Sequence, residues 1–466
     1  MLSIIRENQC YNRIMTKSSN SLMIIGAGLA GCEAAWQAAK RGISVDLYEM
    51  RPGVMTGAHT GGDLAELVCS NSLGSNLKDR ASGVLKEELR LAGSLLVECA
   101  EKAAVPAGNA LAVDRKLFSS EIEKKLHSCH NVHIIREEVR EIPADRPVII
   151  ASGPLSSSAI SAEITKLCGT DNLFFFDAIA PIVEHDSIDL TIAYAGSRYS
   201  KNEDDDGDYI NCPFNRQEYE TFVTELTAAK RIPLKSFEEQ IEQGVAAGKM
   251  SFFEGCLPVE ILAGRSIQAL AFGPMRPVGL IDPRTGKRPW AVLQLRQDNL
   301  SGSLYNLVGF QTNLLQKEQE RVFRMIPGLA NAQFVRYGQM HRNTYICAPG
   351  TLTAALNMID HPQVFFAGQL CGVEGYMGNI AAGLLAGINA ARTIQGQDPL
   401  TLPEEMISGS LFHYIATADG KHFQPMKANF GILPPLENSP RSKRERYQLY
   451  SQRALEKAAA IFGEEL

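Results

Sequence analysis

A glycine-rich turn near the start of the chain constrains the fold more than any other feature. It follows a short apolar run, residues 22–25, that is typical of a buried strand. An alanine-rich segment at 32–41, predicted to be a helix, comes next, and a second predicted strand at 43–49 completes a βαβ unit. The glycines between the first strand and the helix have the spacing Gly-x-Gly-x-x-Gly, which indicates a dinucleotide-binding site.

Each glycine of this turn has its own physical role. Gly26 permits a tight turn, Gly28 lets the backbone approach a pyrophosphate, and Gly31 lets helix and strand pack closely. The free N–H groups at the start of the helix then attract phosphate. Glu49, at the end of the second predicted strand, is expected to bind ribose hydroxyls. The first part of the predicted cofactor site therefore comprises Gly26, Ala27, Gly28, Leu29, Ala30, Gly31, Glu49 and Arg51.

The later sequence predicts that this domain is interrupted and then completed. Helical periodicity covers residues 87–104, and further strands are expected at 132–135 and at 148–151, before Gly153. A strand at 364–367 and a small-residue helix at 378–394 restore the Rossmann-like pattern near the end of the chain. This late return favours FAD over NAD as the bound cofactor. The additional predicted cofactor residues are Gly153, Gly368, Gln369, Gly375 and Tyr376.

We therefore predict an α/β fold: a two-dinucleotide-type, Rossmann-like FAD-binding domain with an inserted α+β domain. A chain of 466 residues exceeds the usual length of one domain, about 100–200 residues. Residues 1–20 contain Arg and Ser as a transit peptide does, but their short length favours a ragged extension. The predicted segments are the extension 1–20, the FAD-binding domain 21–181 and 346–434, the inserted substrate and RNA domain 182–345, and a charged tail 435–466.

Composition narrows the possible functions. None of the ten cysteines forms a C-x-x-C pair, so we predict no metal site and mostly reduced thiols, as in a cytoplasmic protein. No apolar run reaches the ~20 residues that span a bilayer, so no membrane association is expected. The net charge of −6 is mildly acidic, and any contact with nucleic acid must therefore use a local basic patch.

Five further motifs are more specific. They are LVCSNSL at 67–73, FEGCLP at 253–258, VGFQTN at 308–313, MHRNT at 340–344 and GQLCGVEGY at 368–376. Together, and in this order, they resemble the bacterial folate- and FAD-dependent tRNA uracil-5 methyltransferases over about residues 21–434. The resemblance implies transfer of a methylene group from methylenetetrahydrofolate to C5 of the T-loop uridine, position fifty-four of tRNA. FAD would be the methylene and hydride relay and NAD(P)H the reductant.

The resemblance also implies which residues act. Uracil C5 becomes nucleophilic when a thiolate adds to C6; Cys256 matches the family's nucleophile and Cys69 its second functional cysteine. A working thiol needs a nearby cation or helix N-terminus, and the candidate cations are Arg51, His59 and Arg342. Cys371 lies in the predicted flavin loop, but the usual role of a cysteine as a small buried hydrophobe is favoured there.

Two sets of polar residues are assigned to substrates. His341, Arg342 and Asn343 are predicted to line the folate or nucleobase pocket, although a structural pair at a domain junction is an equal alternative. Basic residues around Trp290 are predicted to bind RNA, with a solvated surface as the alternative. These are Arg284, Lys287, Arg288 and Arg296, and a second basic cluster comprises Arg441, Lys443, Arg444 and Arg446. The acidic run 203–208 is predicted to be a solvated loop, because the twelfth position of a calcium loop there would be Pro213 instead of the required glutamate.

Two other functions stay open on sequence alone. One is the flavoprotein that installs aminomethyl groups on wobble uridine, which also uses FAD and methylene-folate but has a longer chain. The other is a flavin-containing RNA-binding protein without turnover, against which the presence of both Cys69 and Cys256 argues. The expected partners are tRNA or another structured RNA, folate and a nicotinamide dinucleotide. The expected state is a monomer or homodimer.

Overall fold

The computed structural model describes residues 21–169, 173–198, 207–232 and 257–465. The predicted nucleophile Cys256, the extension 1–20 and most of the acidic run lie outside the described residues. No helix within the described ranges is long and apolar enough to cross a membrane.

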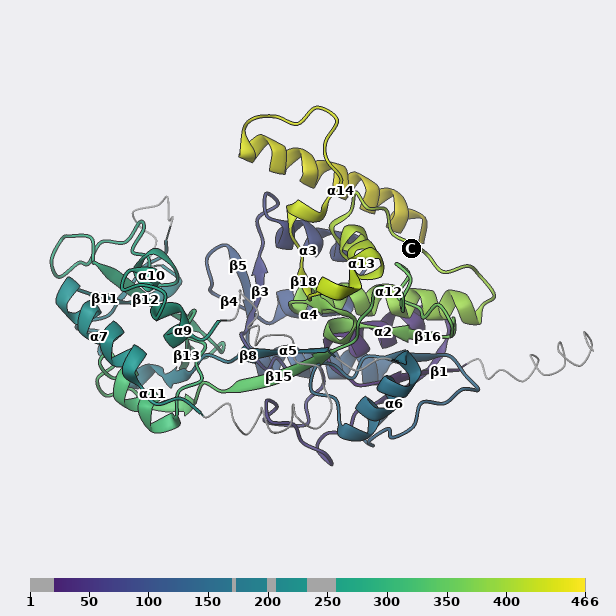
Figure 1. The fold of residues 1–466 in the computed structure, drawn as a ribbon, viewed down its shortest axis with the longest axis horizontal. Helices are drawn as coiled ribbons and strands as arrows, with labels where there is room; N and C mark the ends of the chain where they lie inside the picture. Colours follow the sequence, from purple (N-terminus) through teal and green to yellow (C-terminus); the bar gives the residue numbers. More distant parts are fainter. Residues whose placement is uncertain (1–20, 170–172, 199–206, 233–256, 466) are drawn as a thin grey trace, which may run out of the picture.

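A five-stranded parallel sheet forms the centre of the larger domain (Figure 1). Its strand order is β16-β7-β1-β2-β6, and every pairing is parallel, as the βαβ pattern predicts. The strands β16 and β7 are apolar and buried throughout, and β1 is so after Ser21, as expected for a sheet covered on both faces, whereas side chains of β2 alternate between buried and partly exposed. The strands are β1 (Ser21–Ile25), β2 (Ser44–Tyr48), β6 (Val132–Ile135), β7 (Val148–Ile150) and β16 (Val364–Phe366).

Two helices from opposite ends of the sequence pack closely beside this sheet. They are α2 (Leu29–Lys40) and α12 (Tyr376–Ile394). A Cβ atom at Gly383 would lie 2.2 Å from the Ala30 carbonyl oxygen, and one at Gly387 would lie 2.5 Å from that of Ala34. Only glycine permits such an approach, so the small residues of both helices bring the late glycine loop beside the early one.

The region between the two parts of this domain forms a second sheet with its own core. Six strands have the order β10-β11-β12-β13-β9-β14, and their pairings are antiparallel. Aromatic side chains fill the core, where the rings of Phe222 and Phe310 are stacked at 6.1 Å. The strands are β9 (Ile182–Glu184), β10 (Tyr194–Ala195), β11 (Tyr209–Phe214), β12 (Ala291–Gln297), β13 (Leu304–Leu307) and β14 (Phe334–Arg336). The helices are α7 (Arg216–Ala228), α9 (Val259–Ala263), α10 (Ala269–Phe272) and α11 (Gln316–Phe323).

A two-stranded antiparallel ribbon joins the two domains (Figure 1). Its strands are β8 (Leu173–Ala178) and β15 (Met340–Tyr345), so the chain enters and leaves the inserted domain side by side. The teal inserted domain lies to one side of the larger domain and contacts it through this ribbon and through loops beside it (Figure 1).

The predicted helix at 87–104 is wrong in its bounds. The structure has two helices there, α3 (Ala81–Leu91) and α4 (Leu95–Lys102), because Gly93 adopts a positive φ of 68° and the Ser94 side chain caps the second helix. A small sheet of β3 (Ser72–Ser75), β5 (Ala110–Val113) and β4 (Ala104–Val105) lies nearby. Two more helices of this region are α5 (Arg115–Ser128) and α6 (Ser158–Cys168).

The segment predicted as a charged tail is a packed helix. α14 (Lys443–Glu465), drawn in yellow in Figure 1, lies against α3. Its polar sequence carries a narrow apolar stripe of Tyr450, Ala454, Ala458 and Phe462, all buried in the core of the larger domain. The preceding elements are α13 (Ile407–Thr417) and the short parallel pair β17 (Val373–Glu374) and β18 (Met426–Lys427).

Replacement of Gly383 by alanine should destabilise the protein by roughly 2 kcal/mol or more, because the added methyl group must separate α2 from α12. The matched control is Gly463→Ala in α14, where a Cβ meets nothing within 4 Å. That change should stabilise α14 by about 0.5–1 kcal/mol, because position 463 is exposed and alanine has the higher helix propensity. Denaturant unfolding of both variants tests the comparison, and equal stabilities would contradict the proposed close contact.

Candidate functional site: two cavities that share one loop

The early glycine turn has the geometry that its sequence predicts. Gly26 has a φ of 100°, and a Cβ at Gly31 would lie 1.8 Å from the Gly26 carbonyl oxygen. A Cβ at Gly28, in contrast, would meet nothing within 4 Å, so the backbone there is open to a ligand. The helix that begins at Leu29 has no acidic side chain in its first turn, which leaves its N–H groups suited to phosphate. The tight turn at Gly26 and the close packing at Gly31 are thus confirmed, whereas the approach of a pyrophosphate to Gly28 stays a prediction.

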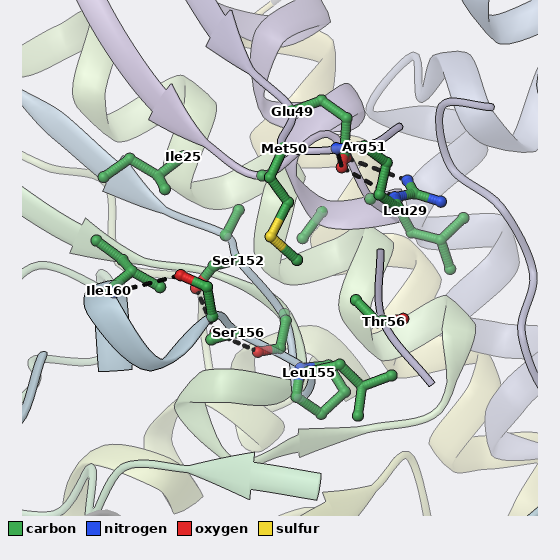
Figure 2. Close-up of a pocket in the computed structure, with 18 of the residues that line it drawn as sticks. Ile25, Leu29, Glu49, Met50, Arg51, Thr56, Ser152, Leu155, Ser156 and Ile160 are labelled. Carbon is green, nitrogen blue, oxygen red and sulfur yellow. Dashed lines mark hydrogen bonds and ion pairs between the residues drawn. The ribbon is translucent and has the colours of Figure 1, made fainter. Parts of the chain in front are cut away.

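A cavity lies over this turn (Figure 2), and residues of the late segment also line it. It comprises about 1020 Å³, counting space open to solvent, which is at the upper end of the ~300–1,000 Å³ usual for ligand pockets. Of the predicted cofactor residues, Gly26, Gly28, Leu29, Ala30, Glu49, Arg51, Gly153, Gly368, Gln369 and Tyr376 line it. Ala27, Gly31 and Gly375 are not among the described residues that line it.

Glu49 and Arg51 form a tight ion pair at one end of the cavity (Figure 2). The Arg51 guanidinium donates to both carboxylate oxygens at 2.9 and 3.1 Å, and the Ala27 N–H donates at 3.2 Å. Burial opposes ionisation of Glu49, but these hydrogen bonds outweigh it and lower the pKa of Glu49. Glu49 is therefore a fixed anion, and a ribose hydroxyl would have to share or replace the donors of Arg51.

The late segment contributes two polar groups directed at the cavity. The Tyr376 hydroxyl accepts a hydrogen bond from the Cys69 backbone N–H at 2.8 Å, and burial raises the pKa of Tyr376, so its own proton is retained and available to a ligand. Asn379, which sequence reasoning missed, lines the same cavity with a buried carbonyl oxygen that has no partner among the described residues. Both groups suit the polar edges of a bound cofactor.

Three arginines hold the loop that contains Cys69. Arg115 of α5 donates to the Cys69 carbonyl at 3.1 Å and also contacts that of Leu67. Arg336 of β14 donates to the Val68 carbonyl at 2.6 Å. Arg296 of β12 completes the set by donating to the Asn71 side chain at 2.9 Å and the Ser70 hydroxyl at 2.6 Å.

These guanidiniums make the surroundings of the Cys69 thiol electropositive. Arg115, Arg296 and Arg336 each interact electrostatically with Cys69. Burial lowers the pKa of Arg296 and of Arg336; for Arg115 the Asp298 carboxylate, 3.0 Å away, outweighs burial and raises the pKa. Nearby positive charge favours a thiolate, which is the reactive form of cysteine.

A second cavity lies on the other side of the Cys69 loop. It encloses about 470 Å³ between Cys69 and Ser70 of the larger domain and the VGFQTN motif of the inserted domain. The lining residues are Cys69, Ser70, Ala180, Arg296, Asn306, Val308, Gly309 and Gln311. Val68 lines the first cavity and Cys69 lines the second, so one loop is the wall between them.

The arginines that act on Cys69 are not among the candidates named from sequence; of those candidates, the side chain of Arg342 lies outside the described part of the structure. Arg51 is held by Glu49 and by Glu66, at 2.8 Å. Burial, followed by the charge of Arg51, lowers the pKa of His59 to about 4, so this imidazole is neutral near pH 7. Sequence could not identify the three arginines, because they come from elements that only the tertiary fold brings together.

The remaining cysteine candidates differ sharply. Cys371 is fully buried, its thiol donates to the Gly368 carbonyl at 3.0 Å, and burial raises its pKa to about 12. This favours the structural role predicted for it. The described chain resumes after Cys256 at Leu257, and the Val259 N–H donates to the Gln311 carbonyl at 2.7 Å, at the rim of the second cavity.

The predicted RNA and folate residues are placed in different surroundings. Arg284, Lys287 and Arg288 are exposed on a turn, and Arg284 pairs with Asp282 at 2.8 Å. The prediction that Arg296 belongs to this exposed patch is wrong, since it is 7% exposed and bonded to the Cys69 loop. Arg216 lies 5.2 Å from the Trp290 ring and adds a cation that the sequence did not indicate.

His341, Arg342 and Asn343 lie on β15, where Asn343 is buried.

Fold and cavity together define a two-dinucleotide-type nucleotide-binding protein. Comparison with protein families adds a match to the model for "Glucose inhibited division protein A" over residues 21–398. A relative from Heliobacterium modesticaldum is 54% identical over 446 residues, covering 96% of this chain and 99% of its own. A second, from Exiguobacterium, is 54% identical over 93% of this chain and 97% of its own. Both are named methylenetetrahydrofolate–tRNA-(uracil-5-)-methyltransferase TrmFO.

The chain therefore belongs to the glucose inhibited division protein A family, in the group of the TrmFO methyltransferases. Among solved structures, GidA of Aquifex aeolicus has the same fold in two crystal forms, with TM-scores of 0.67 and 0.68 at 14% and 16% identity. This chain is covered to 95% in both comparisons, and the GidA chain to 73% and 75%. The likeness confirms the predicted α/β fold.

Substitution of Arg296 by methionine should slow the alkylation of Cys69 at pH 7, by about tenfold, because it removes one of the cations that favour the thiolate. Peptide mass mapping after timed iodoacetamide treatment measures the modification of Cys69 alone. The control is Arg288→Met on the exposed turn, which should leave the rate unchanged. Equal rates in the two variants would show that Arg296 has no influence on the thiol.

Proposed function

We propose that the protein methylates C5 of the T-loop uridine of tRNA, with methylenetetrahydrofolate as the carbon donor, FAD as a bound cofactor and NAD(P)H as the reductant. The observation that carries the proposal is the shared loop: Cys69 lies in the wall between a dinucleotide-type cavity and a second cavity at the domain junction. The high identity to proteins named for this reaction supports the substrate and the donor.

FAD fits the residues of the first cavity. The open backbone at Gly28 and the start of α2 would hold its pyrophosphate, and the Glu49–Arg51 pair lies where the ribose is expected. The unpaired Asn379 oxygen and the Tyr376 hydroxyl would bind the polar edge of its ring system. When bound, FAD supplies the relay of the one-carbon unit and of the hydride that the reaction requires.

The protein's own residues would activate the base. A thiolate that adds to C6 of uracil forms an S–C6 bond, and the displaced electron pair makes C5 nucleophilic. C5 then bonds the one-carbon unit, and a basic group removes the C5 proton as the bond from that carbon to its carrier breaks. A hydride that originates from NAD(P)H reduces the carbon to a methyl group, and breaking of the S–C6 bond releases the thiolate and restores the ring. This scheme requires one nucleophilic thiol and a second acid–base group close to the cofactor.

Cys256 is our candidate for the attack on C6, and Cys69 for the acid–base role. Cys256 is three positions before Val259 in the chain, a span of at most about 11 Å. Val259 is bonded to the rim of the cavity that Cys69 lines. The charge of the three arginines supports a working thiol at Cys69. His341, Arg342 and Asn343 remain candidates for folate, and Arg284, Lys287 and Arg288 for RNA.

The alternative of a wobble-uridine aminomethyl enzyme receives less support. The relatives that match at 54% identity over nearly their whole length are named for uracil-5 methylation. A flavin-containing protein without turnover does not account for a thiol kept in an electropositive cavity.

Purified protein incubated with undermodified tRNA, methylenetetrahydrofolate and NADPH should form 5-methyluridine, detected by mass spectrometry of the nucleosides. Omission of the folate should abolish the product. Cys256→Ala should lose methylation and keep bound flavin, whereas loss of both would make Cys256 structural. Aminomethyl products would favour the wobble-uridine enzyme, and unmodified uridine would favour the binding protein without turnover.

Gly28→Ala should impair flavin binding without unfolding the protein. Gly28 has an ordinary φ of −74° and free space at its Cβ position, so the fold tolerates a methyl group, but that methyl group fills the space needed by the pyrophosphate. Visible flavin absorbance and thermal unfolding of the purified variant measure the two effects separately. The comparison variant is Gly31→Ala, which should destabilise the fold itself because its Cβ would clash with Gly26. Full flavin content in Gly28→Ala would place the cofactor elsewhere.

A further inference from the structure

The second cavity contains a buried donor that the protein itself does not use. Asn306 is 3% exposed, and its amide nitrogen has no hydrogen-bond partner among the described residues. Nearly all buried amide N–H groups in folded proteins are paired, because an unpaired one is unfavourable. Asn306 lines a cavity, so its missing partner is expected to be a ligand rather than another side chain.

Two further groups face the same space from the inserted domain. Arg296 is directly opposite Asn306 in the pairing of β12 with β13, and both line the cavity. Arg296 uses Nε and Nη2 to hold Asn71 and Ser70, which leaves Nη1 without a partner within the described ranges. The side-chain amide of Gln311, which has both a donor and an acceptor, is likewise unpaired in the described structure.

We infer that this cavity binds the target uracil and that Asn306 selects it by donating a hydrogen bond to one of its carbonyl oxygens. The inference rests on the proposed function and deepens it. Uracil presents two carbonyl oxygens on either side of one N–H group. Asn306 and Arg296 can both donate to O4, the oxygen conjugated with the C5–C6 bond, since a carbonyl oxygen has two lone pairs, and the Gln311 carbonyl can accept from the N–H.

The same geometry rejects cytosine. Cytosine has an amino group in place of one carbonyl oxygen and lacks the ring N–H. Its amino group would place a donor against the Asn306 donor, and both would be buried without a partner. The two amide side chains also match a neutral planar ring better than a phosphate or carboxylate, for which charged donors are preferred.

Arg296 has an additional effect at this position. When a thiolate adds to C6, negative charge develops on a uracil carbonyl oxygen. A buried guanidinium beside that oxygen stabilises the charge as it forms. Because Arg296 also bonds the Ser70 hydroxyl, the residue that binds the base is coupled directly to the loop that carries Cys69.

The decisive variant is Asn306→Leu, which keeps the branching at Cγ and the number of side-chain heavy atoms and removes the unpaired amide. Its thermal stability should equal or exceed that of the wild type, since no hydrogen bond within the protein is lost. Its rate of 5-methyluridine formation at low tRNA concentration should fall by about tenfold or more. Bound flavin should be unchanged, because Asn306 does not line the first cavity.

The matched control is Asn211→Leu in the same sheet. Asn211 is also buried, but its amide donates to the Gly196 carbonyl at 2.8 Å and accepts from Gln294 at 3.0 Å. This variant should lose stability, which distinguishes a structural asparagine from one reserved for a ligand. A loss of stability in Asn306→Leu equal to that in Asn211→Leu would overturn the inference.

A second variant, Asn306→Asp, tests selection of the base directly. It replaces the donor by an acceptor, so methylation of uridine should fall at least about tenfold. A tRNA transcript with cytidine at the target position should become a stronger competitor than it is for the wild type. Unchanged competition together with unchanged methylation would overturn the assignment of Asn306.

The outcomes also separate this inference from the proposed function. If the wild-type protein forms no 5-methyluridine, the proposed function is wrong and the uracil assignment falls with it. If the wild type methylates tRNA and Asn306→Leu does so at the same rate, only the uracil assignment is wrong. Normal stability with reduced methylation in Asn306→Leu supports both.

Discussion

The attachment of one loop by three guanidiniums, one buried and two half-buried, is the interaction on which the site depends. Arg115, Arg296 and Arg336 come from α5, β12 and β14, which belong to both domains, and all three converge on residues 67–71. A guanidinium offers up to five donors in a rigid plane, so each can bind the loop and still keep its charge. The hydrogen bonds that fix the loop therefore also fix the two domains relative to each other and make the thiol's surroundings positive.

The loop can separate two cavities only because the cofactor side is itself assembled from distant segments. The contact of α2 with α12, which glycine and alanine make possible, brings Tyr376 beside the early turn. The Tyr376 hydroxyl then holds the Cys69 backbone from the cofactor side while the arginines hold it from the substrate side. A change in the contact between α2 and α12, or in the contact between the two domains, would thus alter the position of Cys69.

Much of this arrangement is local and was predictable from sequence. The glycine turn, the parallel strands and the late return follow from short patterns whose physical cause lies within a few residues. The break at Gly93 and the packing of α14 were missed, since a turn conformation and a narrow apolar stripe are weak signals in a polar sequence. The role of Arg296 was assigned wrongly because charge and a nearby tryptophan suggest a surface, whereas only the fold shows that this side chain points inward.

The unpaired polar groups indicate which ligand each cavity binds, and the sequence motifs do not. Asn379 offers an acceptor to the first cavity and Asn306 a donor to the second, each at a cost of about 1–3 kcal/mol in the unliganded protein. A ligand that supplies the missing hydrogen-bond partner removes this cost. The protein without ligand is therefore less stable because of the groups that select the ligand. An acceptor suits the N–H edge of a flavin, and a donor suits the carbonyl edge of a uracil. The opposite polarity of these two groups, on the two sides of the Cys69 loop, is therefore what assigns cofactor and base to different cavities.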